Sequence, residues 1–368
     1  MTSQGPSITR ILLAVASAAV GIATYLHLNK VITPALAHTV QTCTAVKDFS
    51  SPTLSPDVPK FYGLGLPVLD HFLCFITPFF QTALETPRQR LLSLPLFLIA
   101  IPTFAIFAIE SSRSSARFFI SWFALHSLIF QAVGISVTAP LLWFATWLLT
   151  YTGNRHFTTI SSSVVGAIGV AITLTAAIVA GLLITFYSPS TTLPFDLSQT
   201  QLITAFNLAP ILLPVLWVPV KYLTGGTPRR KSTALAGSEL AQKLYGGLGI
   251  LLIPAHIFFL YSTFAVVFGD GPGDRGEGWD KIYQIVFDPQ DALQRATHFL
   301  VIDAAVLWAT LAGWIALEEG RDSFFGLLSF TFKVGPAAGL CFVARIREQR
   351  IGREIAARIE EAKVKKAE

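Results

Sequence analysis

Long apolar runs constrain the fold of this 368-residue chain more than any other feature of its sequence. Hydrophobic residues make up 52% of the chain and charged residues 13%, and several apolar runs approach 20 residues. A run of about 20 apolar residues is what an α-helix needs to cross the hydrocarbon core of a bilayer. A membrane β-barrel would need short segments of alternating polarity, whereas these runs are continuous. The sequence therefore predicts an all-α, polytopic integral membrane helical bundle.

We expect about eight transmembrane helices, with nine as the alternative. The predicted spans lie near residues 8–28, 63–84, 91–110, 118–150, 164–187, 201–223, 244–268 and 296–317. The run 118–150 is longer than one bilayer requires, so it needs either a tilted helix or a break near Gly134 and Pro140. We interpret it as one span. We expect the apolar run 324–343, which Lys333 and Gly335 interrupt, to lie in the interface or to re-enter the membrane.

The charges of two loops predict the orientation of the chain. Residues 221–243 hold five Lys and Arg against one acid, and residues 269–295 hold six acids against three bases. Because cytosolic loops carry an excess of Lys and Arg, the first loop is predicted to be cytosolic and the second lumenal. Counting spans from there predicts that both termini are cytosolic and that the turn holding Arg88 and Arg90 is cytosolic as well. Residues 1–344 would then form the bundle and 345–368 a charged cytosolic tail helix, in a membrane that we expect to be the endoplasmic reticulum.

Several classes of function receive no support from the composition. Cys43, Cys74 and Cys341 are far apart in the sequence, so we expect neither a zinc site nor a disulfide framework, and redox chemistry is not predicted. No set of His, Cys and Asp has metal-ligand spacing, so no metal and no cofactor are predicted. The net charge of +5 lies in loops and the tail, which indicates orientation in a membrane rather than a nucleic-acid surface.

One predicted span, residues 63–84, carries a carboxylate inside its apolar run. Asp70, Cys74, Thr77 and Gln81 share one helix face, which should point into the bundle. An acid at this depth costs at least about 2.5 kcal/mol on insertion scales, and such acids are functional by default. The alternative is a carboxylate that only hydrogen-bonds a neighbouring helix.

The predicted topology gathers other polar groups in the lumenal half of the bilayer, at the depth of Asp70. This one-sided arrangement predicts a pocket that is closed towards the cytosol. The catalytic candidates are Asp70, Asp303 and Glu110, and the substrate-binding candidates are His126, Gln131, Asn207, His256, His298, Trp308 and Arg113. The alternatives are an interfacial ion pair for Glu110 and Arg113, and hydrogen-bonding interior residues for the histidines.

An acid in an apolar pocket suits one kind of chemistry. Desolvation disfavours the ionised form of a carboxyl group, so the group can stay protonated and act as a general acid. Aromatic ring faces can stabilise a cationic intermediate. Together these features favour cyclisation of a polyprenyl chain that protonation starts. The Asp-rich pairs by which some prenyl enzymes hold magnesium and diphosphate do not occur here, and protonation of an epoxide or alkene needs no metal.

The stretch GLGLPVLDHFLCFITPFFQTAL, residues 63–84, together with the chain length and the predicted spans, resembles the membrane-bound terpene cyclases of fungal meroterpenoid pathways, of the ascofuranone and ascochlorin type. The resemblance implies a lipophilic prenylated aromatic substrate, whose farnesyl chain is cyclised by opening of a terminal epoxide or protonation of a terminal alkene. Two alternatives stay open: a proton-coupled transporter of a lipophilic small molecule, and a receptor or assembly factor. Membrane lipids are expected partners in every case, and nucleic acid in none.

Overall fold

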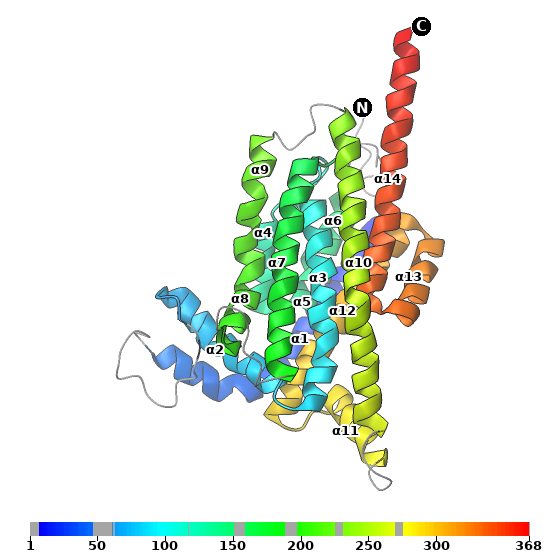
Figure 1. The fold of residues 1–368 in the computed structure, drawn as a ribbon. Coiled ribbons are helices and arrows are strands. Elements are labelled where there is room, and N and C mark those ends of the chain that lie inside the picture. Colours follow the sequence, from blue (N-terminus) through cyan, green and yellow to red (C-terminus); the bar gives the residue numbers. More distant parts are fainter. Residues whose placement is uncertain are drawn as a thin grey trace.

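The computed structural model describes residues 7–46, 61, 63–116, 118–150, 159–187, 197–224, 231–268 and 275–367, whose regular structure is all helical (Figure 1). The helices are α1 (Ile8–Ala45), α2 (Pro67–Ala83), α3 (Pro87–Ser112), α4 (Phe123–Val133), α5 (Ile135–Thr138), α6 (Ala145–Thr150), α7 (Ser162–Tyr187), α8 (Gln199–Leu212), α9 (Val218–Leu223), α10 (Lys231–Phe268), α11 (Arg275–Phe287), α12 (Ala292–Glu319), α13 (Arg321–Val334) and α14 (Pro336–Ala367). The predicted all-α helical bundle is confirmed.

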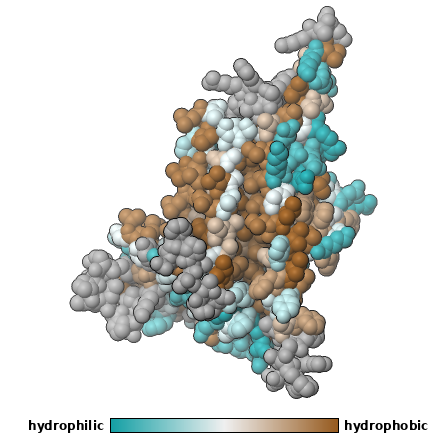
Figure 2. Space-filling view, viewed as in Figure 1, coloured by the Kyte–Doolittle hydropathy of each residue, from teal (hydrophilic) through white to brown (hydrophobic). Residues whose placement is uncertain are grey.

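Six helical segments in the described part of the chain are long and apolar enough to cross a membrane. They are Ile8–Pro34, Pro87–Ser112, Ser162–Tyr187, Gln199–Leu223, Ala234–Ala265 and Ala292–Glu319. Apolar side chains cover the middle of the visible face and polar side chains gather towards its two ends, as an integral membrane protein requires (Figure 2). The predicted spans 63–84 and 118–150 are not among the six, because α2 has 17 residues and the second segment is broken.

Helix α3 forms the centre of the bundle. It packs against α7, α10, α12 and α14, and nearly all of its side chains are buried. Its sequence is apolar all round, which is the pattern of a helix surrounded by protein. Thr86 and Gln89 form a capping box that starts α3, with Pro87 in the first turn, so its beginning is defined locally.

Residues 118–150 form a hairpin rather than the single span that we expected. Helix α4 ends at Gly134, whose φ of 96° is strained for any other residue type, and α5 starts in a new direction. A π-helix, Ala139–Phe144, contains Pro140 and leads into α6. The end of the segment returns to its start, since α6 packs on the turn Phe118–Ile120 and Ser114 N–H donates to the Thr159 carbonyl at 3.0 Å. Gly134 therefore lies at the tip of a segment that enters and leaves at the same end of the bundle.

Hydrogen bonds between helices define two ends of the bundle. Arg90 Nη1 donates to the Phe186 carbonyl at 2.5 Å and Thr297 Oγ1 donates to the Ala83 carbonyl at 3.3 Å, so α3 starts, α7 ends and α12 starts at one end. We name it the Cys43 end, since Cys43 at the end of α1 lies there (Figure 1). The opposite end, where α3 terminates, is the Glu110 end.

Three expectations about the Cys43 end are wrong. The first helix does not stop near residue 28 but continues through Pro34 to Ala45, and α2 is too short to bring the chain back across the bundle. The turn with Arg90 therefore lies at the same end as the start of α12, not at the opposite one. The extension of α1 also places Cys43 beside α2, where it forms a disulfide with Cys74 at a Cα–Cα distance of 5.9 Å. The expectation that the widely spaced cysteines form no disulfide framework is therefore wrong for this pair, because the fold, and not the spacing along the sequence, determines which cysteines meet.

Candidate active site

A cavity of about 460 Å³ lies between α1, α2, α3, α8, α12 and the tip of the 118–150 hairpin, in the half of the bundle towards the Cys43 end. Its wall is mainly apolar and unusually rich in phenylalanine. The Phe side chains that line it are Phe75, Phe79, Phe80, Phe104, Phe130, Phe206 and Phe299. Ring contacts hold this wall together; Phe80, for example, meets Phe206 edge-on with ring centroids 5.8 Å apart. The volume is in the range of a cavity that encloses a small organic ligand.

Asp303 is the one acidic side chain among the residues that line this cavity. It lies on α12 and is 5% exposed. The Ser136 hydroxyl donates to its Oδ1, and the Ser136 backbone N–H donates to the same oxygen at 3.3 Å. Oδ2 makes no hydrogen bond with any described residue. One carboxyl oxygen is therefore held in place, which leaves the other for a ligand.

The tip of the hairpin explains the position of Asp303. Gly134 turns the chain so that Ser136 lies in the first turn of a helical segment, where backbone N–H groups have no partner within the helix. Such N–H groups attract an oxygen acceptor, which here is the carboxyl group of Asp303. A Cβ on Gly134 would lie 3.5 Å from Asp303 Oδ1 and 3.5 Å from Phe299 Cζ. The tip of the hairpin and α12 therefore approach each other closely at Asp303, the one acid among the described residues that line the cavity.

Two of the predicted binding residues share the cavity with Asp303. Gln131 lies in the last turn of α4, and Asn207 lies on α8, where it is 1% exposed. Asn207 Nδ2 donates to the Ile203 carbonyl at 2.8 Å, which orients the amide. These neutral groups can hydrogen-bond a ligand without adding charge to an apolar site.

Asp70 does not line this cavity. It is 3% exposed, and its Oδ1 accepts a hydrogen bond from Leu64 N–H at 2.6 Å. The carboxyl group thereby fastens the segment that enters α2 onto the first turn of that helix. The alternative considered for Asp70 was a hydrogen bond to a neighbouring helix, whereas the observed contact joins it to the segment that precedes its own helix.

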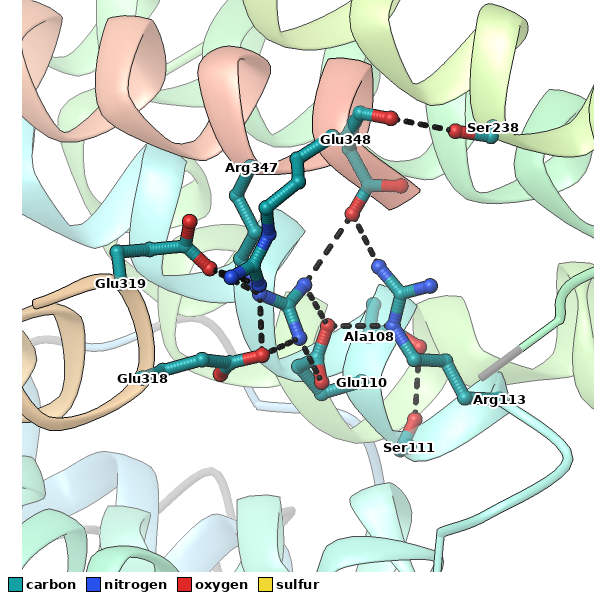
Figure 3. A network of polar contacts seen from close by, with 10 residues as sticks. Ala108, Glu110, Ser111, Arg113, Ser238, Glu318, Glu319, Arg347 and Glu348 are labelled. Atoms are coloured by element: carbon teal, nitrogen blue, oxygen red, sulfur yellow. Dashed lines mark hydrogen bonds and ion pairs between the residues drawn. The ribbon is translucent and has the colours of Figure 1, made fainter. Parts of the chain in front are cut away.

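Glu110 and Arg113 lie at the opposite end of the bundle from the cavity, in a buried ion-pair network (Figure 3). Glu110 Oε1 accepts from Arg113 Nε at 2.6 Å and from Arg347 Nη1 at 2.8 Å. Arg347 also pairs with Glu318 at 2.6 Å, and Glu348 pairs with both arginines. The expectation that Glu110 and Arg113 lie on the same side of the bundle as Asp70 and Asp303 is therefore wrong. It depended on counting residues 118–150 as a span.

The remaining predicted site residues pack outside the cavity wall. His126 lies behind Phe130, with ring centroids 5.6 Å apart. His298 Nε2 lies 2.8 Å from His27 Nε2, between α12 and α1. His256 packs against the turn between α13 and α14 at Gly335, and Trp308 is partly buried on α12. Of the ten candidates, the structure therefore brings Asp303, Gln131 and Asn207 together.

Sequence analysis missed two groups of residues, one in the cavity wall and one in the ion-pair network at the opposite end of the bundle. Helix α2 supplies three of the phenylalanines that line the cavity, Phe75, Phe79 and Phe80, whereas Trp308 was the aromatic side chain predicted to bind the substrate. The sequence did contain a signal for this aromatic wall, since Phe75 and Phe79 are one helical turn apart in the 63–84 stretch and therefore share a helix face. Arg347 and Glu348, by contrast, were assigned to a solvated tail, and their burial had no local sequence signal.

No group of three or more His, Cys, Asp and Glu side chains that could hold a metal occurs among the described residues. The polar groups of the cavity are one carboxyl group and neutral side chains, a donor set that suits proton transfer and hydrogen bonding.

Comparison with known proteins gave one match. The family model described as the CtvD domain matches residues 9–270, which is more than two thirds of the chain. No match was found among curated proteins or among solved structures. The matched range includes most of the cavity wall and ends before α12, which supplies Asp303.

Proposed function

Because the chain belongs to the CtvD-domain family, a family of fungal meroterpenoid cyclase-like proteins, we propose that it is a membrane-embedded terpene cyclase that acts on a farnesyl-aryl substrate. The observation that carries the proposal is one carboxyl group, Asp303, at the wall of a Phe-lined cavity at membrane depth.

In the proposed reaction the carboxyl group of Asp303 donates its proton to a terminal alkene carbon or a terminal epoxide oxygen. Protonation of an alkene leaves a tertiary carbocation, and protonation of an epoxide lets its C–O bond break as a neighbouring double bond attacks. Each ring closes when a π-electron pair forms the new C–C bond and moves the cation along the chain. Loss of a proton from the last cation returns the proton that Asp303 supplied, so the reaction is a net isomerisation.

The cavity wall suits the cations of this reaction. The faces of the phenylalanine rings carry partial negative charge and attract a cation more strongly when water is excluded. An apolar wall also offers few nucleophiles that would trap a carbocation early. We assign Asp303 as proton donor, Gln131 and Asn207 as substrate-binding residues, and structural roles to Asp70 and Glu110.

Two separate features support a lumenal position for the cavity. The start of α10 at Lys231 and the second half of α14, which is rich in Lys and Arg, lie at the Glu110 end (Figure 1), which the positive-inside rule assigns to the cytosol. The Cys43–Cys74 disulfide belongs to the other end, and disulfides persist in oxidising compartments such as the lumen of the endoplasmic reticulum. Both features favour an enzyme of that membrane, with cytosolic termini and a lumenal active site.

The test is cyclisation of an epoxidised farnesyl-phenol, and of its alkene counterpart, by microsomes with matched amounts of the wild type, Asp303→Asn and Asp70→Asn. The Asn side chain keeps the size of Asp but cannot supply the proton. We expect turnover by Asp303→Asn to fall at least about 100-fold, the usual contribution of a general acid. Asp70→Asn is the matched control, because its amide oxygen can still accept from Leu64 N–H.

Full activity of Asp303→Asn would refute the assignment of the proton donor. If the wild type converts neither substrate, the cyclase proposal fails. Uptake of the compound into sealed vesicles driven by a pH gradient would then favour the alternative, a proton-coupled transporter.

A further inference from the structure

Polar side chains gather at the open side of the cavity. Tyr25, Asn29 and Thr33 lie at successive i, i+4 positions of α1, so they share one face, and all three line the cavity. They are also exposed at the surface of the protein, as are Ala132 and Val133 at the end of α4. The cavity wall around Asp303 and Asn207 is buried instead. The cavity therefore opens between α1 and the end of α4.

This opening lies at the depth of the membrane. Residues 25–33 belong to the apolar segment Ile8–Pro34, one of the six that can span a bilayer. An opening there faces hydrocarbon, so a ligand can enter sideways from the lipid phase. It also places Tyr25, Asn29 and Thr33 where unpaired polar groups are costly.

One hydrogen bond orients the central member of this group. Thr33 Oγ1 donates to Asn29 Oδ1 at 3.0 Å, which leaves the two N–H groups of Asn29 Nδ2 without a partner among the described residues. The Asn29 amide is therefore arranged as a donor. Its complement is an oxygen acceptor, such as a phenolic or carbonyl oxygen on an aromatic ring.

The contact between His27 and His298 sets the distance from these residues to Asp303. Helices α1 and α12 touch there, with the two Nε2 atoms 2.8 Å apart. Asp303 lies five residues further along α12 towards the Glu110 end, whereas Asn29 and Thr33 lie two and six residues along α1 towards the Cys43 end. At 1.5 Å per residue, Asp303 is separated along the bundle axis by roughly 10 Å from Asn29 and roughly 16 Å from Thr33. A farnesyl chain can bridge such a separation.

We propose that Asn29 and Thr33 form a head-group subsite at a lateral entrance, which binds the oxygen-bearing aromatic ring of the substrate while the prenyl chain enters first and reaches Asp303. This inference rests on the proposed function, since it assigns the two ends of the same substrate. The subsite selects substrates by the oxygen on the ring and sets which end of the chain meets the acid.

The test compares epoxyfarnesyl-phenol with epoxyfarnesyl-benzene, which lacks the ring oxygen, in the wild type and in Asn29→Leu and Thr33→Val. Both variants keep the approximate volume of the side chain and remove its polar group. We expect kcat/KM for the phenol to fall roughly three- to tenfold, the value of one or two neutral hydrogen bonds, with less than a twofold change for the benzene. Thr173→Val is the matched control, because Thr173 is exposed on α7 and does not line the cavity.

Equal losses for both compounds in Asn29→Leu would overturn the subsite, since they would report altered shape rather than a lost hydrogen bond. No loss for either compound would overturn it too. Binding of the two compounds to purified Asp303→Asn protein, with and without Asn29→Leu, separates this proposal from the proposed function. Selective weakening of phenol binding supports the subsite even if the wild type cyclises neither compound, and unchanged binding refutes it even if both are cyclised.

Discussion

Replacement of Arg347 by Met should destabilise the protein more than any surface change. Arg347 is 2% exposed, and its guanidinium group pairs with Glu110 at 2.8 Å, with Glu318 at 2.6 Å and with Glu348 at 3.2 Å. It also lies 5.0 Å from the centre of the Trp314 ring. Met keeps much of the side-chain length but removes the charge, so Glu110 and Glu348 would keep their contacts with Arg113 alone and Glu318 would lose its ion pair with Arg347. Loss of one partner from a buried ion pair costs about 3 to 5 kcal/mol, because the charge left behind stays desolvated.

The measurement is the free energy of unfolding of purified protein in mixed micelles, from titration with a denaturing detergent. Lys363→Met is the matched control, since Lys363 pairs with Glu360 at 2.6 Å while the two side chains are 67% and 68% exposed. An exposed pair of this kind contributes about 1 kcal/mol or less. If Arg347→Met lies within about 1 kcal/mol of Lys363→Met, the network is not the desolvated set of ion pairs that its burial implies, and the reasoning is refuted.

Two further predictions concern the backbone and the disulfide. Gly335 and Gly320 both have positive φ, 96° and 87°, but a Cβ at Gly335 would lie 2.5 Å from the His256 ring whereas one at Gly320 would meet nothing within 4 Å. Gly335→Ala should therefore lower the thermal unfolding midpoint clearly more than Gly320→Ala, and equal shifts would show that the ring moves aside without cost. Cys43→Ser should lower the free energy of unfolding by about 4 kcal/mol, since the disulfide closes a loop with a sequence separation of 31. Treatment with a reductant should destabilise the wild type but not Cys43→Ser, and an equal response of both proteins would contradict the Cys43–Cys74 pair.

The long apolar runs in the sequence were sufficient to predict the class of fold. Long apolar runs predict helices that cross a bilayer, because backbone groups in hydrocarbon must pair within their own helix. The same local signals located α3, α7 and α12 to within a few residues, and α3 has a capping box and Pro87 at its start. Asp303 was predicted as a candidate site residue for a similar reason, because it is an acid within an apolar run.

The path of the chain between those helices could not be predicted. Whether Gly134 bends a long helix or reverses it depends on whether α5 can pack against α1 and α12, which is a tertiary contact. The count of spans depends on that choice, so a single error moved Glu110 from one end of the bundle to the other. The Cys43–Cys74 pair was missed for a related reason, since it depends on how far α1 continues beyond Pro34.

The sequence by itself determined that this chain is a helical membrane protein and that a few polar residues lie inside its apolar segments, because the bilayer imposes one requirement on every spanning segment. Only the tertiary structure decided which of those residues meet. It placed Asp303, Gln131 and Asn207 at one Phe-lined cavity, left Asp70 as a helix-start contact, and joined Glu110 to Arg347 across 237 positions of sequence. Contacts of that kind arise from the packing of helix faces, and helix packing is not a local property of any segment.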